Sequence, residues 1–237
     1  MKTGFKFRRI ALAGALALAP AAMLIAPQQA GQAAPAAQTD WSRRISTTPM
    51  GAHMLGNPLA KTRLVEYMSY TCPHCAHFEE EAYGPIRKLF VGKGNISFEV
   101  RNLLRDPVDM TVALLARCGG KSKFFANHKA LLARQSVWLG KAASANQQGW
   151  YQGPFDDRLK KISADIGLYD EMATLGFTRA QADACLTDKA AQKAVLALSK
   201  YGSDTDKVNA TPSFTINGKL LDNVHDWKKL EGALTSG

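Results

Sequence analysis

The feature that most constrains this chain is a pair of cysteines with two residues between them, at the point where an apolar strand is followed by a helix. Residues 64–68 form a mostly apolar run, typical of a strand buried on both faces, and helical spacing begins at Pro73. Cys72 and Cys75 stand at this junction with Pro73 and His74 between them. The first backbone N–H groups of a helix lack partners within the helix, so a thiolate at Cys72 can accept hydrogen bonds from them. Pro73 suits this first turn because it has no N–H.

Two cysteines at this spacing can close a small-ring disulfide, in which we expect Cys72 to be exposed and Cys75 to face inward. A thiolate can then attack the outer sulfur and pass through a mixed disulfide. The helix dipole alone lowers a thiol pKa by about one unit, since it supplies roughly 1 kcal/mol and one pKa unit is worth about 1.4 kcal/mol. A larger change requires direct hydrogen bonds from backbone N–H groups and from the ring of His74. The alternatives are a static disulfide and an exposed His74 without a role.

The N-terminal segment has the pattern of a bacterial-type signal peptide over residues 1–33. Four cations precede an uncharged run at residues 10–26, and small residues follow it. An uncleaved membrane anchor is the alternative, although Pro20 interrupts the run, which is marginally short for spanning a bilayer. We expect export to the periplasm, followed by a disordered lead-in at residues 34–50.

The charge left after export does not indicate a nucleic-acid partner. Removing four cations and no anions takes the formal net charge from +10 to +6, and the remaining cations are not clustered with aromatic residues. Export also changes how the cysteines are interpreted, because four cysteines in an oxidising compartment suggest two pairs.

The order of elements predicts an α/β thioredoxin fold with a large all-helical insertion. Strands are expected at residues 53–56, 62–69 and 96–104, and a helix interrupted by Gly84 and Pro85 is expected to start at Pro73. Its acids at residues 79–81, Glu79 among them, are expected on a solvated face. A hairpin turning at Asn217 and Gly218 and a final helix close the chain. The thioredoxin-like domain then comprises residues 51–105 and 208–237, and the insertion comprises residues 106–207. Its predicted helices cover residues 108–117, 124–139, 155–166 and 179–200.

Two stretches together resemble the DsbA family of periplasmic thiol oxidases, over roughly residues 50–237. The first runs from Val65 through the Cys-Pro-His-Cys motif to Glu80, and the second is Thr211-Pro212-Ser213-Phe214 with the hairpin after it. The acid six residues before the first cysteine is part of the resemblance. A lone Cys-x-x-Cys would be a weak signal, but the combination is specific.

The resemblance implies roles for three further residues. Glu66 matches an acid that lies beneath the disulfide and assists proton movement at the inner cysteine, so its pKa should be raised by desolvation. A solvent-facing acid at a sheet edge is the alternative. Thr211 and Pro212 match the cis-proline step opposite the disulfide, whose backbone pairs with extended substrate. The best-known oxidases carry Val at the position of Thr211, whereas Thr is frequent in disulfide isomerases and in other DsbA-like branches, so the resemblance leaves the direction of electron flow open.

Cys118 and Cys185 fall in predicted helices of the insertion. We expect a structural disulfide between them, and some DsbA-like proteins of alphaproteobacteria resemble this chain in carrying a second pair. Free buried thiols or a redox-tuning pair are the alternatives. A zinc site is not expected, because neither cysteine has a Cys-x-x-Cys partner, and Ala76 occupies the position that a c-type haem motif needs for His.

The leading interpretation is an exported, monomeric thiol-disulfide oxidoreductase without a cofactor. It would donate the Cys72–Cys75 disulfide to reduced, unfolded exported proteins and be reoxidised by a membrane-bound partner. A disulfide isomerase or reductase is the main alternative, and a non-redox peptide-binding chaperone is the third. Only about 20 residues precede the first predicted strand after cleavage, too few for a separate dimerisation domain of the kind some isomerases carry.

Overall fold

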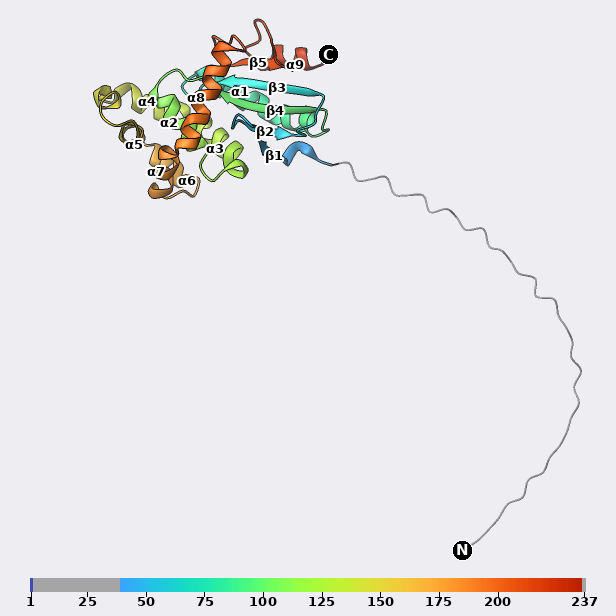
Figure 1. Cartoon of the computed structure of the whole chain (residues 1–237), viewed down its shortest axis with the longest axis horizontal. Coiled ribbons are helices and arrows are strands. Elements are labelled where there is room, and N and C mark those ends of the chain that lie inside the picture. The colour runs from blue at the N-terminus through green and yellow to red at the C-terminus, as the bar shows by residue number, and fades with distance from the viewer. Residues whose placement is uncertain (2–38, 236–237) are drawn as a thin grey trace, which may run out of the picture. The chain divides into compact units, whose positions relative to one another are not determined.

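A mixed sheet with helices on both faces organises the chain in the computed structural model, which describes residue 1 and residues 39–235 (Figure 1). The predicted signal peptide at residues 1–33, apart from residue 1, and the first part of the predicted lead-in therefore lie outside the described residues. The strands of the sheet are β1 (Ile45–Thr47), β2 (His53–Gly56), β3 (Thr62–Met68), β4 (Ile96–Asn102), β5 (Ser213–Ile216) and β6 (Lys219–Leu220). Their spatial order is β1-β2-β4-β3-β5-β6.

Strand β3 is central and leads directly to the cysteine motif. It pairs in parallel with β4, with Leu64 opposite Phe98, and antiparallel with β5, with Glu66 opposite Phe214. Its buried positions face both sides of the sheet, as the apolar run at residues 64–68 predicts. The expected thioredoxin fold is confirmed in this arrangement, with the C-terminal hairpin β5-β6 beside the strand that carries the motif.

Helices cover the two faces of the sheet in different ways. Helix α1 (Pro73–Pro85) and helix α9 (Trp227–Thr235) contact each other, and α1 packs its Phe78 against Phe214 of the sheet. Helix α8 (Lys189–Asp204) packs on the opposite face, where Gly202 lies against the ring of Tyr67. A methyl group at Gly202 would approach that ring to 2.6 Å, so the close contact of helix and sheet depends on glycine.

The interruption predicted at Gly84 and Pro85 occurs as a change in helical winding. The α-helix ends at Pro85 and the chain continues as a π-helix over Ile86–Val91. Pro85 has no N–H to donate to Glu81, and the N–H of Ile86 is shared between the carbonyl oxygens of Ala82 and Tyr83.

The region between β4 and β5 is helical in the described residues, which confirms the expected insertion. It contains α2 (Pro107–Ala116), α3 (Lys121–Ala133), α4 (Gln135–Ser144), a 3₁₀ turn (Gln147–Trp150), α5 (Phe155–Asp165), α6 (Leu168–Thr174), α7 (Arg179–Thr187) and α8. Two predicted helices were wrong in extent. The one at 124–139 divides at Arg134, and the one at 179–200 divides at Asp188, whose carboxylate accepts from the N–H groups of Ala190 and Ala191 and starts α8.

The expectation of a disordered lead-in through residue 50 was wrong for its later part. Trp41–Arg43 form a 3₁₀ turn, and Ile45–Thr47 form β1, with Ile45 opposite Leu55 of β2. The N–H of Trp41 donates to the carbonyl oxygen of Gly92 at 3.2 Å. Pairing with distant segments therefore orders a stretch that is too short and too polar to predict as a strand.

The hydrophobic core continues from the sheet into the insertion. Phe78 of α1, Leu114 of α2 and Trp138 of α4 belong to the same buried cluster. The insertion is consequently packed onto the active-site helix. None of the helices in the described part of the chain has the length and apolar character needed to span a bilayer.

Candidate active site

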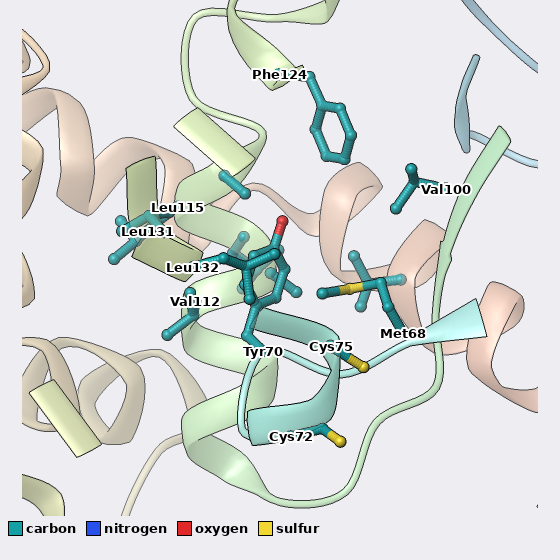
Figure 2. Close-up of a cluster of buried hydrophobic side chains, with 14 of the residues drawn as sticks. Met68, Tyr70, Cys72, Cys75, Val100, Val112, Leu115, Phe124, Leu131 and Leu132 are labelled. Atoms are coloured by element: carbon teal, nitrogen blue, oxygen red, sulfur yellow. The ribbon is translucent and has the colours of Figure 1, made fainter. Parts of the chain in front are cut away.

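The two cysteines lie at the start of α1, after a short loop that follows β3. Cys72 is the N-cap residue with extended backbone angles, and Pro73 occupies the first helical turn. Both cysteines are free thiols, and Figure 2 shows their side chains pointing to the same side of the helix. Cys75 is fully buried. The expectation of an exposed Cys72 was wrong in degree, because this residue is only 4 % exposed.

Cys72 nevertheless forms part of the wall of a partly open cavity of about 430 Å³. The segment from Asn209 to Thr211 and Arg105 line the same cavity. Although it is buried, Cys72 therefore borders a space that another group can enter.

The contacts of Cys72 favour its thiolate. A hydrogen bond from the Cys75 side chain lowers the pKa of Cys72 to about 5, and hydrogen bonds from Thr211 and from the backbone N–H groups of Cys75 and His74 act in the same direction, against the effect of burial. Burial raises the pKa of Cys75 well above its ordinary value, and its hydrogen bond to Cys72 and the nearby Glu66 add to this. The outer sulfur is therefore the more acidic of the two, and the surroundings of the inner sulfur favour the thiol.

His74 contributes in a way that the sequence did not indicate. Its side chain is exposed, and its backbone N–H is one of the groups that favour the Cys72 thiolate, after the Cys75 side chain, Thr211 and the Cys75 N–H. The prediction that its imidazole ring would donate to the sulfur is not supported by this geometry. Pro73 is exposed beside it, so both residues of the dipeptide form the outer surface of the motif.

Glu66 is buried in β3, in the interior of the sheet. It is 2 % exposed, and its Oε2 atom has no hydrogen-bond partner among the described residues. Burial raises the pKa of this carboxyl well above its ordinary range, and the nearby Glu79 and Cys72 raise it further. The alternative of a solvent-facing edge acid is excluded, because β3 has neighbours on both sides.

The Thr211–Pro212 peptide bond is cis. Thr211 faces the first cysteine, and the thiol of Cys72 donates to the carbonyl oxygen of Thr211 at 3.2 Å. This contact favours the thiol, whereas the Thr211 hydrogen bond to the sulfur favours the thiolate. Thr211 thus has two opposing effects on the protonation of Cys72.

Two side chains of the insertion hold the loop before Cys72, and neither was identified from the sequence. The Nε2 atom of Gln135, at the start of α4, donates to the carbonyl oxygens of Tyr70 at 2.6 Å and Cys72 at 2.9 Å. Asp109 of α2 accepts from the hydroxyl of Ser69 and from the N–H of Tyr70. Both side chains come from segments distant in sequence, and no local motif marks them.

Glu79 was assigned from the sequence to a solvated helix face, and this was wrong. It is 4 % exposed and lies on α1, four residues after Cys75. Its Oε2 atom is 3.4 Å from Nε2 of His128, which is itself buried in α3. The periodicity of α1 alone cannot predict that one of its acidic residues is buried, because the partner of this residue comes from another helix.

Cys118 and Cys185 form a disulfide that joins the end of α2 to α7. This bond is distant in sequence from the Cys72 motif and spans 67 residues. The described residues contain no group of three or more His, Cys, Asp or Glu side chains placed to hold a metal ion.

Comparison with known proteins agrees with this geometry. The sequence profile of the thioredoxin family matches residues 47–236. A protein-disulfide isomerase from Novosphingobium aromaticivorans is similar in structure, with 42% identity, a TM-score of 0.75, and coverage of 78% of this chain and 96% of that one. The alpha-DsbA1 of Wolbachia pipientis shares the fold at 19% identity and a TM-score of 0.61, covering 78% of this chain and 89% of its own.

Curated relatives extend beyond the matched region. A Rickettsia typhi protein that carries the name protein-disulfide oxidoreductase is 26% identical over 171 residues, which cover 72% of this chain and 56% of that protein. The chain thus matches about half the length of these relatives. The family profile covers most of the chain, and the chain therefore belongs to the thioredoxin family.

Proposed function

We propose that this protein is an exported oxidase that introduces disulfides into reduced proteins. A substrate thiolate attacks the Sγ of Cys72, the Cys72–Cys75 bond breaks, and Cys75 leaves and takes up a proton. A second substrate thiolate then attacks the substrate sulfur of the mixed disulfide and releases Cys72 as a thiolate. Two electrons pass from substrate to enzyme, and the substrate gains one disulfide.

The observation that carries this proposal is the stabilised Cys72 thiolate. Its pKa of about 5 results from hydrogen bonds that exist only when the site is reduced. Stabilisation of the reduced form makes the disulfide a stronger oxidant, as it does in DsbA. Glu66, buried next to the pair, supplies the group that exchanges a proton with Cys75.

The wall of the cavity beside Cys72 supports a role in binding extended substrate. Asn209 and Ala210 are exposed, and they lead into Thr211 and the cis bond at Pro212. The exposed backbone of this segment can pair with a substrate strand and provide affinity that tolerates sequence variation, in exchange for the hydrogen bonds that Ser213 and Cys72 now donate to the carbonyl oxygens of Ala210 and Thr211. Substrates would be unfolded exported proteins in the periplasm, and a membrane-bound partner would reoxidise the cysteine pair.

Transfer of the disulfide can be measured directly. The oxidised protein is mixed with a reduced, unfolded test protein, and disulfides in the test protein are counted by thiol alkylation and mass spectrometry. The wild type should transfer one disulfide per molecule, and Cys72→Ser with Cys75→Ala should transfer none. Equal maturation with this double variant would contradict a redox role and favour a peptide-binding chaperone.

Isomerase activity is a second candidate, because the structure at 42% identity bears the name protein-disulfide isomerase and because Thr211 precedes the cis proline. Refolding of a scrambled, fully oxidised test protein by the reduced enzyme separates the two functions. An oxidase should be fast with reduced substrate and slow with scrambled substrate. The redox potential of the Cys72–Cys75 pair gives an independent answer, since a strongly reducing value would exclude the oxidase direction.

A further inference from the structure

A second cavity adjoins the one that Cys72 borders, on the side of the helical insertion. Its volume is about 340 Å³, and its wall combines Thr71 with the start of α2, one side of α4 and the end of the 3₁₀ turn. Thr71 directly precedes Cys72, and consecutive Cα atoms are about 3.8 Å apart. Arg105 lines both cavities. The two spaces are therefore neighbours with a shared wall.

Arg105 forms the boundary between the two cavities. Its Nη1 atom donates to the carbonyl oxygen of Thr71 at 3.3 Å, so its side chain lies across the backbone that leads to Cys72. A guanidinium group has five N–H donors, which leaves donors for the carbonyl oxygens of a chain that passes over it. Because Arg105 is exposed, a bound chain can cross from one cavity to the other along it.

The polar side chains in the wall of the second cavity are held by groups of the protein itself. The hydroxyl of Thr71 donates to Asp106 at 2.9 Å, and the amide of Gln147 donates to the carbonyl oxygen of Ala142 at 3.0 Å. The rest of the wall, apart from Arg105, is apolar or aromatic and consists of Val108, Leu139, Ala142, Ala143, Trp150 and Tyr151.

This apolar part of the wall has a buried floor and an exposed rim. Trp150 is 1 % exposed, and its indole N–H donates to Asp165 at 2.7 Å, which fixes the ring. Tyr151 next to it is 60 % exposed, and Leu139 of α4 is half-buried. Apolar surface of this kind gains free energy when another apolar group removes it from water. The wall therefore suits an apolar side chain rather than an ion.

We propose that the second cavity is a subsite for an apolar side chain of the same substrate chain whose thiol reacts at Cys72. This inference rests on the proposed thiol-disulfide function, which it deepens by naming a feature of the substrate. A segment of the substrate is the occupant because the cavity is continuous, through Arg105, with the one that Cys72 borders.

The geometry of an extended chain fixes where the apolar residue must stand. Side chains two and four residues from the substrate cysteine point to the same side as its thiol, and they lie about 7 Å and about 13 Å along the chain. A side chain three residues away points to the opposite side. We therefore expect the apolar residue two or four positions from the reacting cysteine.

Peptide thiols test this expectation. Full-length Cys75→Ala protein is charged at Cys72 with thionitrobenzoate as a mixed disulfide. A peptide thiolate attacks the Cys72 sulfur, forms the peptide mixed disulfide and releases thionitrobenzoate, whose absorbance gives the second-order rate constant. Peptides of identical composition carry one central cysteine and one phenylalanine, placed two, three or four positions away on either side.

One side of the cysteine should show a positional preference. On that side, we expect rate constants about tenfold higher with phenylalanine at position two or four than at position three, because only the first two positions direct the ring into the second cavity. Free cysteine, which is too small to reach that cavity, gives the reactivity of Cys72 alone.

Variants of the wall identify the cavity that is responsible. Ala143→Phe fills the second cavity from its own wall and should reduce the preference to less than about twofold, and Tyr151→Ala removes the rim and should weaken it. Val137→Phe adds the same ring to an exposed position of α4 outside the walls of both cavities, and it should keep the preference. All three variants should react with free cysteine as fast as the parent protein does.

Equal rate constants for all peptides, a preference that survives both Ala143→Phe and Tyr151→Ala, or an equal loss in Val137→Phe would overturn the subsite. A change of molar mass in Ala143→Phe, measured by light scattering, together with the absence of any peptide preference would instead assign the cavity to contact with a second copy of the chain. Failure of the proposed function is seen separately, as an oxidised wild type that transfers no disulfide to a reduced protein although the peptide preference is present.

Discussion

The reactivity of Cys72 is decided by groups within one or two contacts of its sulfur. The thiol of Cys75, the side chain of Thr211 and backbone N–H groups of the first helical turn all favour the thiolate. A helix dipole alone accounts for about one pKa unit, so most of the change comes from these direct hydrogen bonds. The ring of the exposed His74 is not among them, although the Cys-Pro-His-Cys sequence made it the first candidate.

Because the pKa of Cys72 is lowered by folding, the stability of the reduced protein should depend on pH. The thiolate contribution is fully present above the unfolded pKa of about 8.5 and is lost as pH falls through the folded pKa of about 5. Reduced wild type should exceed Cys72→Ser in free energy of unfolding by roughly 2 kcal/mol more at pH 7 than at pH 5. Urea denaturation at several pH values measures this difference.

The comparison with Cys72→Ser removes the contributions of titrating groups that Cys72 does not influence, which leaves Cys72 together with Cys75 and Glu66. Absorbance of the thiolate at 240 nm gives an independent titration and should show a midpoint near 5. A stability difference that stays constant from pH 5 to 8.5 would contradict the assignment of the shift to Cys72.

At the scale of elements, the insertion supports the active-site loop as well as covering it. Gln135 of α4 and Asp109 of α2 reach the backbone between Ser69 and Cys72 from two different helices. The buried backbone groups of this loop need hydrogen-bond partners from other segments, because the loop forms neither helical nor sheet hydrogen bonds of its own. The insertion therefore helps to fix the loop that positions Cys72.

Gln135→Leu tests this support. It leaves the buried carbonyl oxygens of Tyr70 and Cys72 without their donor, which should lower the free energy of unfolding by roughly 2–4 kcal/mol. It should also raise the pKa of Cys72, because the loop no longer fixes the sulfur against the helix start. Denaturation and thiolate absorbance measure the two effects. Gln148→Leu, at an exposed glutamine, is the control and should change neither by a measurable amount.

The contact of α8 with the sheet gives a second prediction at this scale. Gly202→Ala would place a methyl group 2.6 Å from the Tyr67 ring, which hydrogen bonds from Arg101 and to Asp206 hold in place. Overpacking of this kind should cost about 1–3 kcal/mol of stability.

Gly140→Ala is the matched change, since it lies within α4 with open space around it and should stabilise the protein by up to about 1 kcal/mol. Urea denaturation compares the two. Equal effects of the two substitutions would show that α8 can move away from the sheet at little cost.

For the whole molecule, the sequence predicted the fold and its local elements better than the contacts between segments distant in sequence. Patterns that are local, such as the apolar run at 64–68, the helix starting at Pro73 and the hairpin at Asn217, led to the correct fold. Features that depend on other segments were missed or wrong. Strand β1 is ordered by its pairing with β2, and Asp188 divides one predicted helix into α7 and α8. In the site, Cys72, Cys75 and Glu66 followed from position, whereas Glu79 was assigned to solvent because His128 lies 49 positions away in the sequence.

The disulfide between Cys118 and Cys185 should act on the stability of the whole molecule. It closes a loop of 67 residues and joins α2, which holds the active-site loop, to α7 at the far part of the insertion. In the chain-entropy account, such a loop stabilises the folded state by about 4 kcal/mol. Because one buried cluster includes both the sheet and the insertion, loss of this constraint should weaken the entire fold in one transition.

Replacing both cysteines with alanine measures this contribution, provided that Cys72 and Cys75 are serine in both proteins being compared, so that only one disulfide is in question. Without reductant, the pair of alanines should lower the free energy of unfolding by about 4 kcal/mol. With a reductant strong enough to open the bond, the two proteins should differ by less than about 1 kcal/mol, because each then unfolds to an unconstrained chain. A gap that persists after reduction would assign the stabilisation to the packing of the cysteine side chains, of which Cys118 is 1 % exposed, and would remove loop closure as its cause.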